Sequence, residues 1–225
     1  MALLRIVERS SPNHARRGGP ARIDMLVLHY TGMKTAKAAL DRLCDPGAKV
    51  SAHYSVDEDG TVYAHVQEAR RAWHAGLSSW AGATDINARS IGIELVNPGH
   101  EFGYRDFPDA QIEALITLCH GIVLRHPIAP ARVLGHSDVA PARKEDPGEL
   151  FPWARLAKAG IGLWPQGIAG ELGPEALQRY GYDPNVPRES IITAFQRHFR
   201  PQKLDGKWDG ECAGLLASLL TAPGV

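Results

Sequence analysis

Two histidines and one aspartate are the residues of this chain whose types and positions could together hold a metal ion. His136 and Asp146 lie in one short run, residues 135–148. His29 lies far upstream, at the end of an apolar segment. Zinc bound by three protein groups keeps a fourth position for water, and that water is the reagent of a hydrolase. Taken singly, each histidine is more often a satisfied polar residue, and Asp146 could equally cap the turn before Pro147.

Two further ionisable side chains could supply the acid–base and electrostatic parts of such a hydrolysis. Glu94 is an acid within residues 90–95, a run that looks buried on both faces. A buried carboxylate requires a proton, a metal or a hydrogen bond, and near an activated water it could act as general base. Lys144 stands two residues before Asp146 and could stabilise an oxyanion. The alternatives are a solvent-facing glutamate and a solvated surface lysine.

Four residues that lie between His29 and His136 in the sequence are candidates for binding a substrate. Trp73 and His74 form a pair that could make an apolar wall with a polar tip for a sugar or a peptide. Asn87 and Arg89 come just before the run that carries Glu94, and an arginine can hold a carboxylate through two parallel hydrogen bonds. Core packing is the alternative for the first pair, and surface solvation is the alternative for the second.

The hydrophobic pattern predicts the elements that would position these residues. Strands are expected at residues 23–30, 52–56, 61–66, 90–96 and 133–134, and helices at residues 34–43 and 109–125. A loop is expected at residues 10–20. In the first strand the odd-numbered positions share one face, and His29 is among them. Strands that alternate with helices favour an α/β fold, with a mixed central sheet flanked by helices.

The pattern changes beyond residue 165, where no β-like run remains. Three short helices are expected there, at residues 171–180, 188–199 and 210–220. We therefore divide the chain into a catalytic domain, residues 1–165, and a small all-α three-helix C-terminal domain, residues 170–225. A unit of about 55 residues can bury only a modest core of its own.

The composition limits the partners and the compartment. Lys+Arg and Asp+Glu balance at 25 each, which gives no electrostatic reason to bind nucleic acid or an anionic membrane. No segment reaches the length of a transmembrane helix, and Arg5 and Glu8 break the N-terminal apolar run before it resembles a signal peptide. Three scattered cysteines, Cys44, Cys119 and Cys212, are expected to be reduced thiols. We therefore expect a cytoplasmic protein, or a periplasmic one if a leader precedes this sequence.

Five segments between residues 20 and 160 carry a more specific signal. They are LHYT at 28–31, VSAHY at 50–54, RAWHAG at 71–76, SIGIEL at 90–95 and the run at 136–148. In this order they resemble the zinc-dependent N-acetylmuramoyl-L-alanine amidases. That family includes the bacterial muropeptide-recycling amidase, phage lysozyme-type amidases and peptidoglycan recognition proteins.

The resemblance implies a zinc hydrolase with named roles. His29, His136 and Asp146 would bind Zn²⁺, Glu94 would be the catalytic acid and base, and Lys144 would stabilise the tetrahedral intermediate. The bond cleaved would join N-acetylmuramic acid, or its 1,6-anhydro form, to the L-alanine of the stem peptide. The reaction would serve peptidoglycan turnover or muropeptide recycling. The partners would be soluble muropeptides or the sacculus, with no nucleic acid and no membrane span.

Two features of the resemblance leave alternatives open. Residues 170–225 resemble a three-helix peptidoglycan-binding domain more loosely, and a generic amphipathic helical tail would look similar. Phage-type members place a catalytic tyrosine where this chain has Ala52. A non-catalytic peptidoglycan receptor on the same fold is the rival function, although such receptors lose a metal ligand and all three ligand positions are filled here. A zinc peptidase is a second rival, which the residues alone do not exclude.

Overall fold

The computed structural model describes residues 4–18, 22–167 and 170–222. The strands are β1 (Ile6–Glu8), β2 (His14–Arg16), β3 (Met25–Tyr30), β4 (Tyr54–Val56), β5 (Val62–Ala64), β6 (Arg70–Ala72), β7 (Ser90–Leu95) and β8 (Val133–Gly135). The helices are α1 (Ala36–Cys44), α2 (Ile86–Arg89), α3 (Gly99–Phe102), α4 (Asp109–Arg125), α5 (His136–Val139), α6 (Trp153–Lys158), α7 (Leu177–Tyr180), α8 (Arg188–Phe199) and α9 (Gly210–Leu220), with 3₁₀ turns η1 (Pro130–Arg132) and η2 (Pro174–Ala176).

The described strands form one mixed sheet and one small separate sheet. The main sheet has the order β1-β5-β4-β7-β3-β8, in which β4 and β5 are antiparallel and the other neighbours are parallel. Strands β2 and β6 pair antiparallel in the second sheet. Since β3, β7 and β8 run parallel, their carboxyl ends meet at one edge, which is where α/β sheets place their binding sites. The predicted α/β fold with a mixed central sheet is confirmed.

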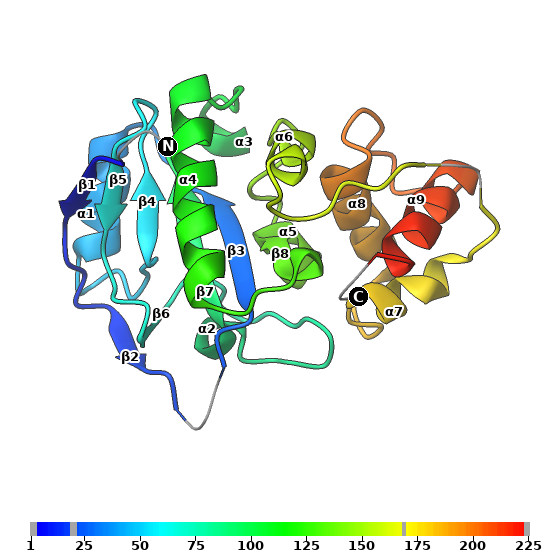
Figure 1. Cartoon of the computed structure of the whole chain (residues 1–225), viewed down its shortest axis with the longest axis horizontal. Helices are drawn as coiled ribbons and strands as arrows, with labels where there is room; N and C mark the ends of the chain where they lie inside the picture. The colour runs from blue at the N-terminus through cyan, green and yellow to red at the C-terminus, as the bar shows by residue number, and fades with distance from the viewer. Residues whose placement is uncertain (1–3, 19–21, 168–169, 223–225) are drawn as a thin grey trace.

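The alternation of side chains along β3 divides the core into two clusters. Leu26 and Leu28 belong to a cluster on the face covered by α4. Met25 and Val27 belong to a second cluster, which also contains the apolar side chains of α7, α8 and α9. Figure 1 shows α4 lying across the sheet and α7 to α9 beyond the β8 edge. His29 follows Val27 by two residues and therefore shares the face that the C-terminal helices help to bury.

Helix α4 has the bounds that the helical spacing predicts, residues 109–125. Its apolar stripe packs on the sheet, and one polar side chain adds a specific link. Gln111 Nε2 donates to the backbone oxygens of Val56, at 2.9 Å, and of Val96, at 3.0 Å. These two carbonyl groups lie at the ends of neighbouring strands, so Gln111 ties α4 to both strand ends.

Other predicted bounds differ from the observed ones by a few residues. Helix α1 begins after Thr35, whose side chain accepts a hydrogen bond from Ala38 N at 3.2 Å and so caps the helix. The expected loop at residues 10–20 is wrong in part, because residues 14–16 form β2. That strand exists through its pairing with β6, more than 50 residues away, and its short polar sequence carries no local strand signal.

The C-terminal segment contains the expected helices and packs against the rest of the molecule. Helices α8 and α9 have the predicted bounds, whereas Pro174 restricts the first expected helix to η2 and α7. Helix α8 lies beside α5. The ring of Tyr182 meets the buried ring of Trp80 with centroids 4.9 Å apart. None of the helices in the described ranges is long and apolar enough to cross a membrane.

Candidate metal centre and active site

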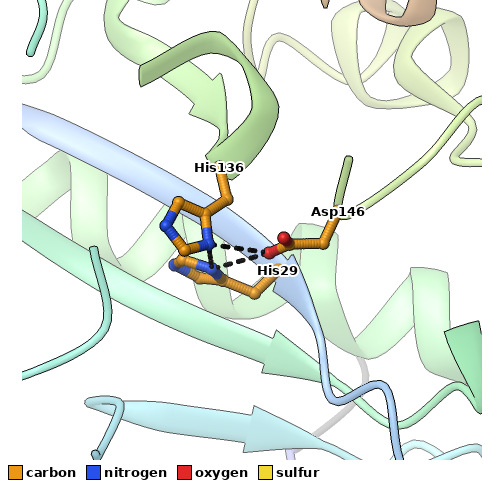
Figure 2. Close-up of side chains that lie close together, drawn as sticks. All are labelled: His29, His136 and Asp146. Carbon is orange, nitrogen blue, oxygen red and sulfur yellow. Dashed lines mark hydrogen bonds and ion pairs between the residues drawn. The ribbon is translucent and has the colours of Figure 1, made fainter. Parts of the chain in front are cut away.

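Three buried side chains from separate elements converge at the carboxyl edge of the sheet. His29 comes from the end of β3, His136 from the first turn of α5 after β8, and Asp146 from the loop that follows α5 (Figure 2). His29 Nδ1 lies 3.0 Å from His136 Nδ1 and 2.9 Å from Asp146 Oδ2. The third side of the triangle, from His136 Nδ1 to Asp146 Oδ2, is 3.0 Å. These are the residues that the sequence predicts as metal ligands.

The hydrogen bonds behind His29 determine which of its ring nitrogens carries the proton. Ser90 Oγ donates to the backbone oxygen of Ile86 at 2.7 Å, so it accepts from His74 Nε2 at 3.1 Å. His74 Nδ1 must then accept from His29 Nε2, also at 3.1 Å. This relay leaves an unprotonated Nδ1 on His29, directed at the other two ligand atoms.

His136 has the same arrangement through a different partner. Its Nε2 lies 3.1 Å from the backbone oxygen of Ala75, which can only accept, so Nδ1 is the nitrogen without a proton. Two imidazole lone pairs and one carboxylate oxygen of Asp146 therefore face one another within about 3 Å. Without a cation between them such a buried set is repulsive, and with one it is a ligand set.

The size of this triangle fits a small divalent cation. Tetrahedral coordination with bonds of about 2.0–2.1 Å places the ligand atoms about 3.3 Å apart, and the observed separations are 2.9–3.0 Å. Among the described histidine, cysteine, aspartate and glutamate side chains, His29, His136 and Asp146 are the only three whose ligand atoms lie close enough together to hold a metal ion. The residues present therefore fit the metal that the resemblance implies.

Burial and charge keep His29 in the ionisation state that a metal needs. Burial, followed by the nearby His136, lowers the pKa of His29 to about 4. At neutral pH His29 is therefore a neutral imidazole, which is the form that binds a metal.

Glu94 stands directly beside the candidate metal ligands. It occupies the position on β7 that pairs with His29 on β3. Its Oε2 is buried and has no hydrogen-bond partner among the described residues. Burial and then the charge of Asp146 raise the pKa of Glu94 well above its ordinary value, while Lys144 opposes them. A carboxyl group with a raised pKa beside a metal site is suited to exchange a proton with a reacting water.

A cavity of about 370 Å³ opens in front of these groups. Its wall includes the three ligands together with Glu94 and Lys144. The cavity therefore collects all five residues that the sequence predicts as ligands or catalytic groups, although they come from three separate segments of the chain.

Trp73 and His74, predicted to contact substrate, both line this cavity. His74 has a further role, because its ring lies between His29 and Ser90 in the relay described above. Gly92 makes room for that ring, since a Cβ atom at position 92 would overlap it.

Asn87 and Arg89, predicted to contact substrate, are not among the residues that line this cavity, and both have partners within the fold. Asn87 Oδ1 accepts from the backbone nitrogens of His74, at 3.0 Å, and Ala75, at 2.9 Å. It thus shapes the segment that supports both ligand histidines. The Arg89 guanidinium forms an ion pair with Asp24. Both side chains are therefore committed within the fold, and the sequence pattern shows only that they precede β7.

Sequence reasoning misses two residues of this region. Ser90 ends the relay behind His29, and no sequence motif distinguishes it from an ordinary strand serine. His100 lines the cavity from α3, where its Nε2 lies 3.2 Å from Glu149. His100 follows the turn at Asn97, and the distance in sequence between His100 and the candidate ligands does not indicate where His100 lies in space.

Comparison with known proteins agrees with this geometry. A family model described as N-acetylmuramoyl-L-alanine amidase matches residues 19–149. The N-acetylmuramoyl-L-alanine amidase AmiD of Escherichia coli K12 is 41% identical over an alignment that covers 88% of this chain and 83% of AmiD. The 1,6-anhydro-N-acetylmuramyl-L-alanine amidase AmpD of Haemophilus influenzae is 33% identical and matches 64% of this chain and 86% of its own length.

Solved structures show the same likeness over nearly the whole chain. The complex of Escherichia coli AmiD with the substrate anhydro-N-acetylmuramic acid-L-Ala-D-gamma-Glu-L-Lys has a TM-score of 0.79 at 38% identity, covering 90% of this chain and 91% of that one. AmpDh3 of Pseudomonas aeruginosa has a TM-score of 0.77 at 34% identity, covering 94% of each chain.

Proposed function

The chain belongs to the N-acetylmuramoyl-L-alanine amidase family, and from that premise we propose how its residues carry out the reaction. It hydrolyses the amide bond between N-acetylmuramic acid and the L-alanine of the stem peptide, on muropeptides that include the 1,6-anhydro form. His29, His136 and Asp146 hold a zinc ion, Glu94 transfers the proton, and Lys144 stabilises the developing negative charge.

The observation that carries this proposal is the set of three buried ligand atoms with no proton between them. Zinc is the metal that best suits two imidazoles and one carboxylate in an open site. When bound there, it would supply the Lewis acidity that activates water and polarises the scissile carbonyl.

The remaining chemistry belongs to side chains of the cavity. Glu94 removes a proton from the attacking water as the carbon–oxygen bond forms, which its raised pKa favours. Lys144 lies in the same cavity wall and offers an ammonium group to the carbonyl oxygen as that oxygen becomes negative. Glu94 then delivers the proton to the alanine nitrogen as the carbon–nitrogen bond breaks. The products are the lactyl carboxylic acid and a stem peptide with a free amino group.

The test uses purified protein with 1,6-anhydro-muropeptide and, separately, with intact sacculi, each with and without a chelator. We expect free stem peptide in the mass spectrum, its loss with chelator, and its recovery when zinc is restored. Glu94→Gln should retain zinc and lose about 10²–10⁴-fold in turnover. A zinc-loaded protein that cleaves neither substrate but binds them would instead be a peptidoglycan receptor.

The proposal also assigns separate roles to two parts of the chain. We propose residues 1–165 as the catalytic domain and residues 170–225 as a peptidoglycan-binding-like domain, supported by the resemblance of the C-terminal helices to such domains. Sedimentation of the zinc-loaded Glu94→Gln variant with sacculi measures wall binding without cleavage. Soluble muropeptide should compete for this binding at the active site but not at a separate wall-binding surface.

We also propose a reducing compartment, the bacterial cytoplasm, for this enzyme. The support is that Cys44, Cys119 and Cys212 are free thiols and the last two are buried. Fractionation of cells that express the natural gene, with an antibody against the protein, tests this. Recovery in the periplasmic fraction would contradict it and would favour trimming of the wall over recycling.

A further inference from the structure

A mostly buried guanidinium group on the C-terminal segment has one long ion pair and an Nε without a hydrogen-bond partner among the described residues. The side chain of Arg197, on α8, is only 12% exposed. Its Nε is buried without a hydrogen-bond partner among the described residues. Arg197 Nε forms a long ion pair with Glu149 Oε2, at 3.7 Å, which is beyond hydrogen-bond distance. Burying an unsatisfied donor is costly, so the position is explained if a ligand supplies the acceptor.

The same side chain lines a groove of about 440 Å³ between the loop at residues 141–145 and α8. Lys144 and Glu145 line both this groove and the active-site cavity. The two spaces are therefore adjacent, separated only by the loop that leads to Asp146. A substrate held in the cavity could extend a chain into the groove.

The stem peptide of the proposed substrate has the chemistry to fill this groove. The substrate bound to the Escherichia coli relative contains a γ-linked D-glutamate as the second residue after the scissile bond. A γ-linkage leaves the α-carboxylate free, and the last residue of the stem carries a second free carboxylate. A planar guanidinium receives a carboxylate through two parallel, charge-assisted hydrogen bonds.

We propose that the groove is a subsite for a free carboxylate of the stem peptide, and that Arg197 is the residue that binds it. This inference rests on the proposed amidase function. Glu145 and Glu189 also face the groove, so it is not a general anion site and suits a peptide that carries an amine as well as a carboxylate. The C-terminal segment would thereby take part in choosing the substrate.

The experiment compares variants of the enzyme on substrates whose carboxylates have been amidated one at a time. We would measure kcat and KM of the zinc enzyme on four muropeptides: the free acid, the α-amide of the glutamate, the C-terminal amide, and the double amide. In the unmodified enzyme, amidation of the carboxylate that Arg197 binds should lower kcat/KM about tenfold or more, because a hydrogen bond to a charged group contributes about 1.5–3 kcal/mol. Which amide has this effect identifies which carboxylate is bound.

Arg197→Gln should lower kcat/KM on the free acid by a similar factor, mainly through KM, and should not change it on the matching amide. Arg197→Met keeps the aliphatic packing and should behave alike, whereas Arg197→Lys should recover part of the loss. Arg188→Gln, an exposed arginine on the same helix, is the matched control and should resemble the unmodified enzyme. Zinc content and melting temperature are recorded for every variant.

The outcomes separate the two proposals. If no muropeptide is cleaved, the amidase function fails and the subsite fails with it. If all four are cleaved equally well by the unmodified enzyme, the function stands and the subsite is overturned. If the Arg197 variants lose activity equally on acid and amide, Arg197 supports the structure and does not bind substrate.

Discussion

Two buried clusters of histidine and aspartate lie close together in this protein and have opposite properties. In the first, Asp146 Oδ2 faces the unprotonated Nδ1 atoms of His29 and His136. In the second, Asp138 accepts three hydrogen bonds at 2.7 Å, from Tyr182 Oη, from His198 Nδ1 and from a backbone nitrogen.

Both clusters are buried and contain the same residue types. They differ in where the protons lie. Every group that touches Asp138 brings a hydrogen, so its charge is satisfied within the protein. The backbone nitrogen is that of Gly135, directly before His136, and the other two donors come from the C-terminal segment. The Asp138 cluster therefore joins the C-terminal helices to the turn that carries a metal ligand. The Asp146 cluster lacks protons and requires a cation.

The largest expected effect is the loss of the metal from the first cluster. Asp146→Asn replaces a charged ligand with a poor one and should leave the purified protein without zinc. The metal contributes several kcal/mol to the transition state, so turnover should fall on the order of a thousandfold. Zinc content by atomic emission and stem-peptide release measure the two effects. Stoichiometric zinc in this variant would contradict the assignment of the ligands.

Substitutions in the second cluster should lower the stability of the protein and leave metal binding unchanged. Asp138→Ala leaves Tyr182 and His198 as buried donors without an acceptor, and should lower the free energy of unfolding by about 3 kcal/mol. Urea denaturation of the chelator-treated protein measures this without a contribution from zinc. Tyr182→Phe removes one donor and should lower it by about 1 kcal/mol. Zinc stoichiometry at saturating metal should stay at one in both variants, and its loss would mean that the clusters are not independent.

The relay behind His29 should have a smaller effect, on metal affinity. Ser90→Ala removes the acceptor that directs the proton of His74, so His29 is no longer held in one tautomer. Zinc affinity should fall about tenfold, the lower end of the effect of such supporting groups. Competition with a chromogenic chelator measures it. Ser55→Ala is the matched control, since it breaks a comparable 2.7 Å bond, from Ser55 Oγ to His65, outside the metal site.

The metal-free protein should lose stability in mild acid. Burial lowers the pKa of His29 to about 4 and that of His53 to about 3, and it lowers the pKa of His74 well below the ordinary value. The unfolded chain, with histidine pKa values near 6.5, then binds more protons than the folded protein below that pH. The free energy of unfolding should fall by about 1.4 kcal/mol per pH unit for each such group, as pH drops from about 6 toward 4.

Urea denaturation at several pH values checks this expectation. His53 lies outside the ligand set, so His53→Gln removes one titrating group and should reduce the slope by that group's share. A slope that the variant does not change would show that His53 is not a buried neutral imidazole in the folded protein.

The local sequence pattern was sufficient to predict the helices and strands whose formation depends on neighbouring residues in the sequence. Helices α4, α8 and α9 have the bounds that their apolar spacing predicts, because each buries one stripe and ends at residues that cannot extend it. The strand carrying His29 and the strand carrying Glu94 were predicted for the same reason. Their pairing, which sets the two residues side by side, was not deduced, because register depends on contacts across the sheet.

The sequence by itself determined the ligand and catalytic candidates, since His29, Glu94, His136, Lys144 and Asp146 stand in ordered motifs whose side chains have the chemistry of a hydrolase. Only the tertiary structure decided which nitrogen of each histidine faces the candidate metal site. It also decided that the same residue types form a hydrogen-bonded cluster around Asp138. The physical reason is that hydrogen-bond partners assign protons, and those partners come from segments tens of residues away. The same reason gives Asn87 and Arg89 their partners within the fold and leaves Arg197 Nε without a hydrogen-bond partner among the described residues.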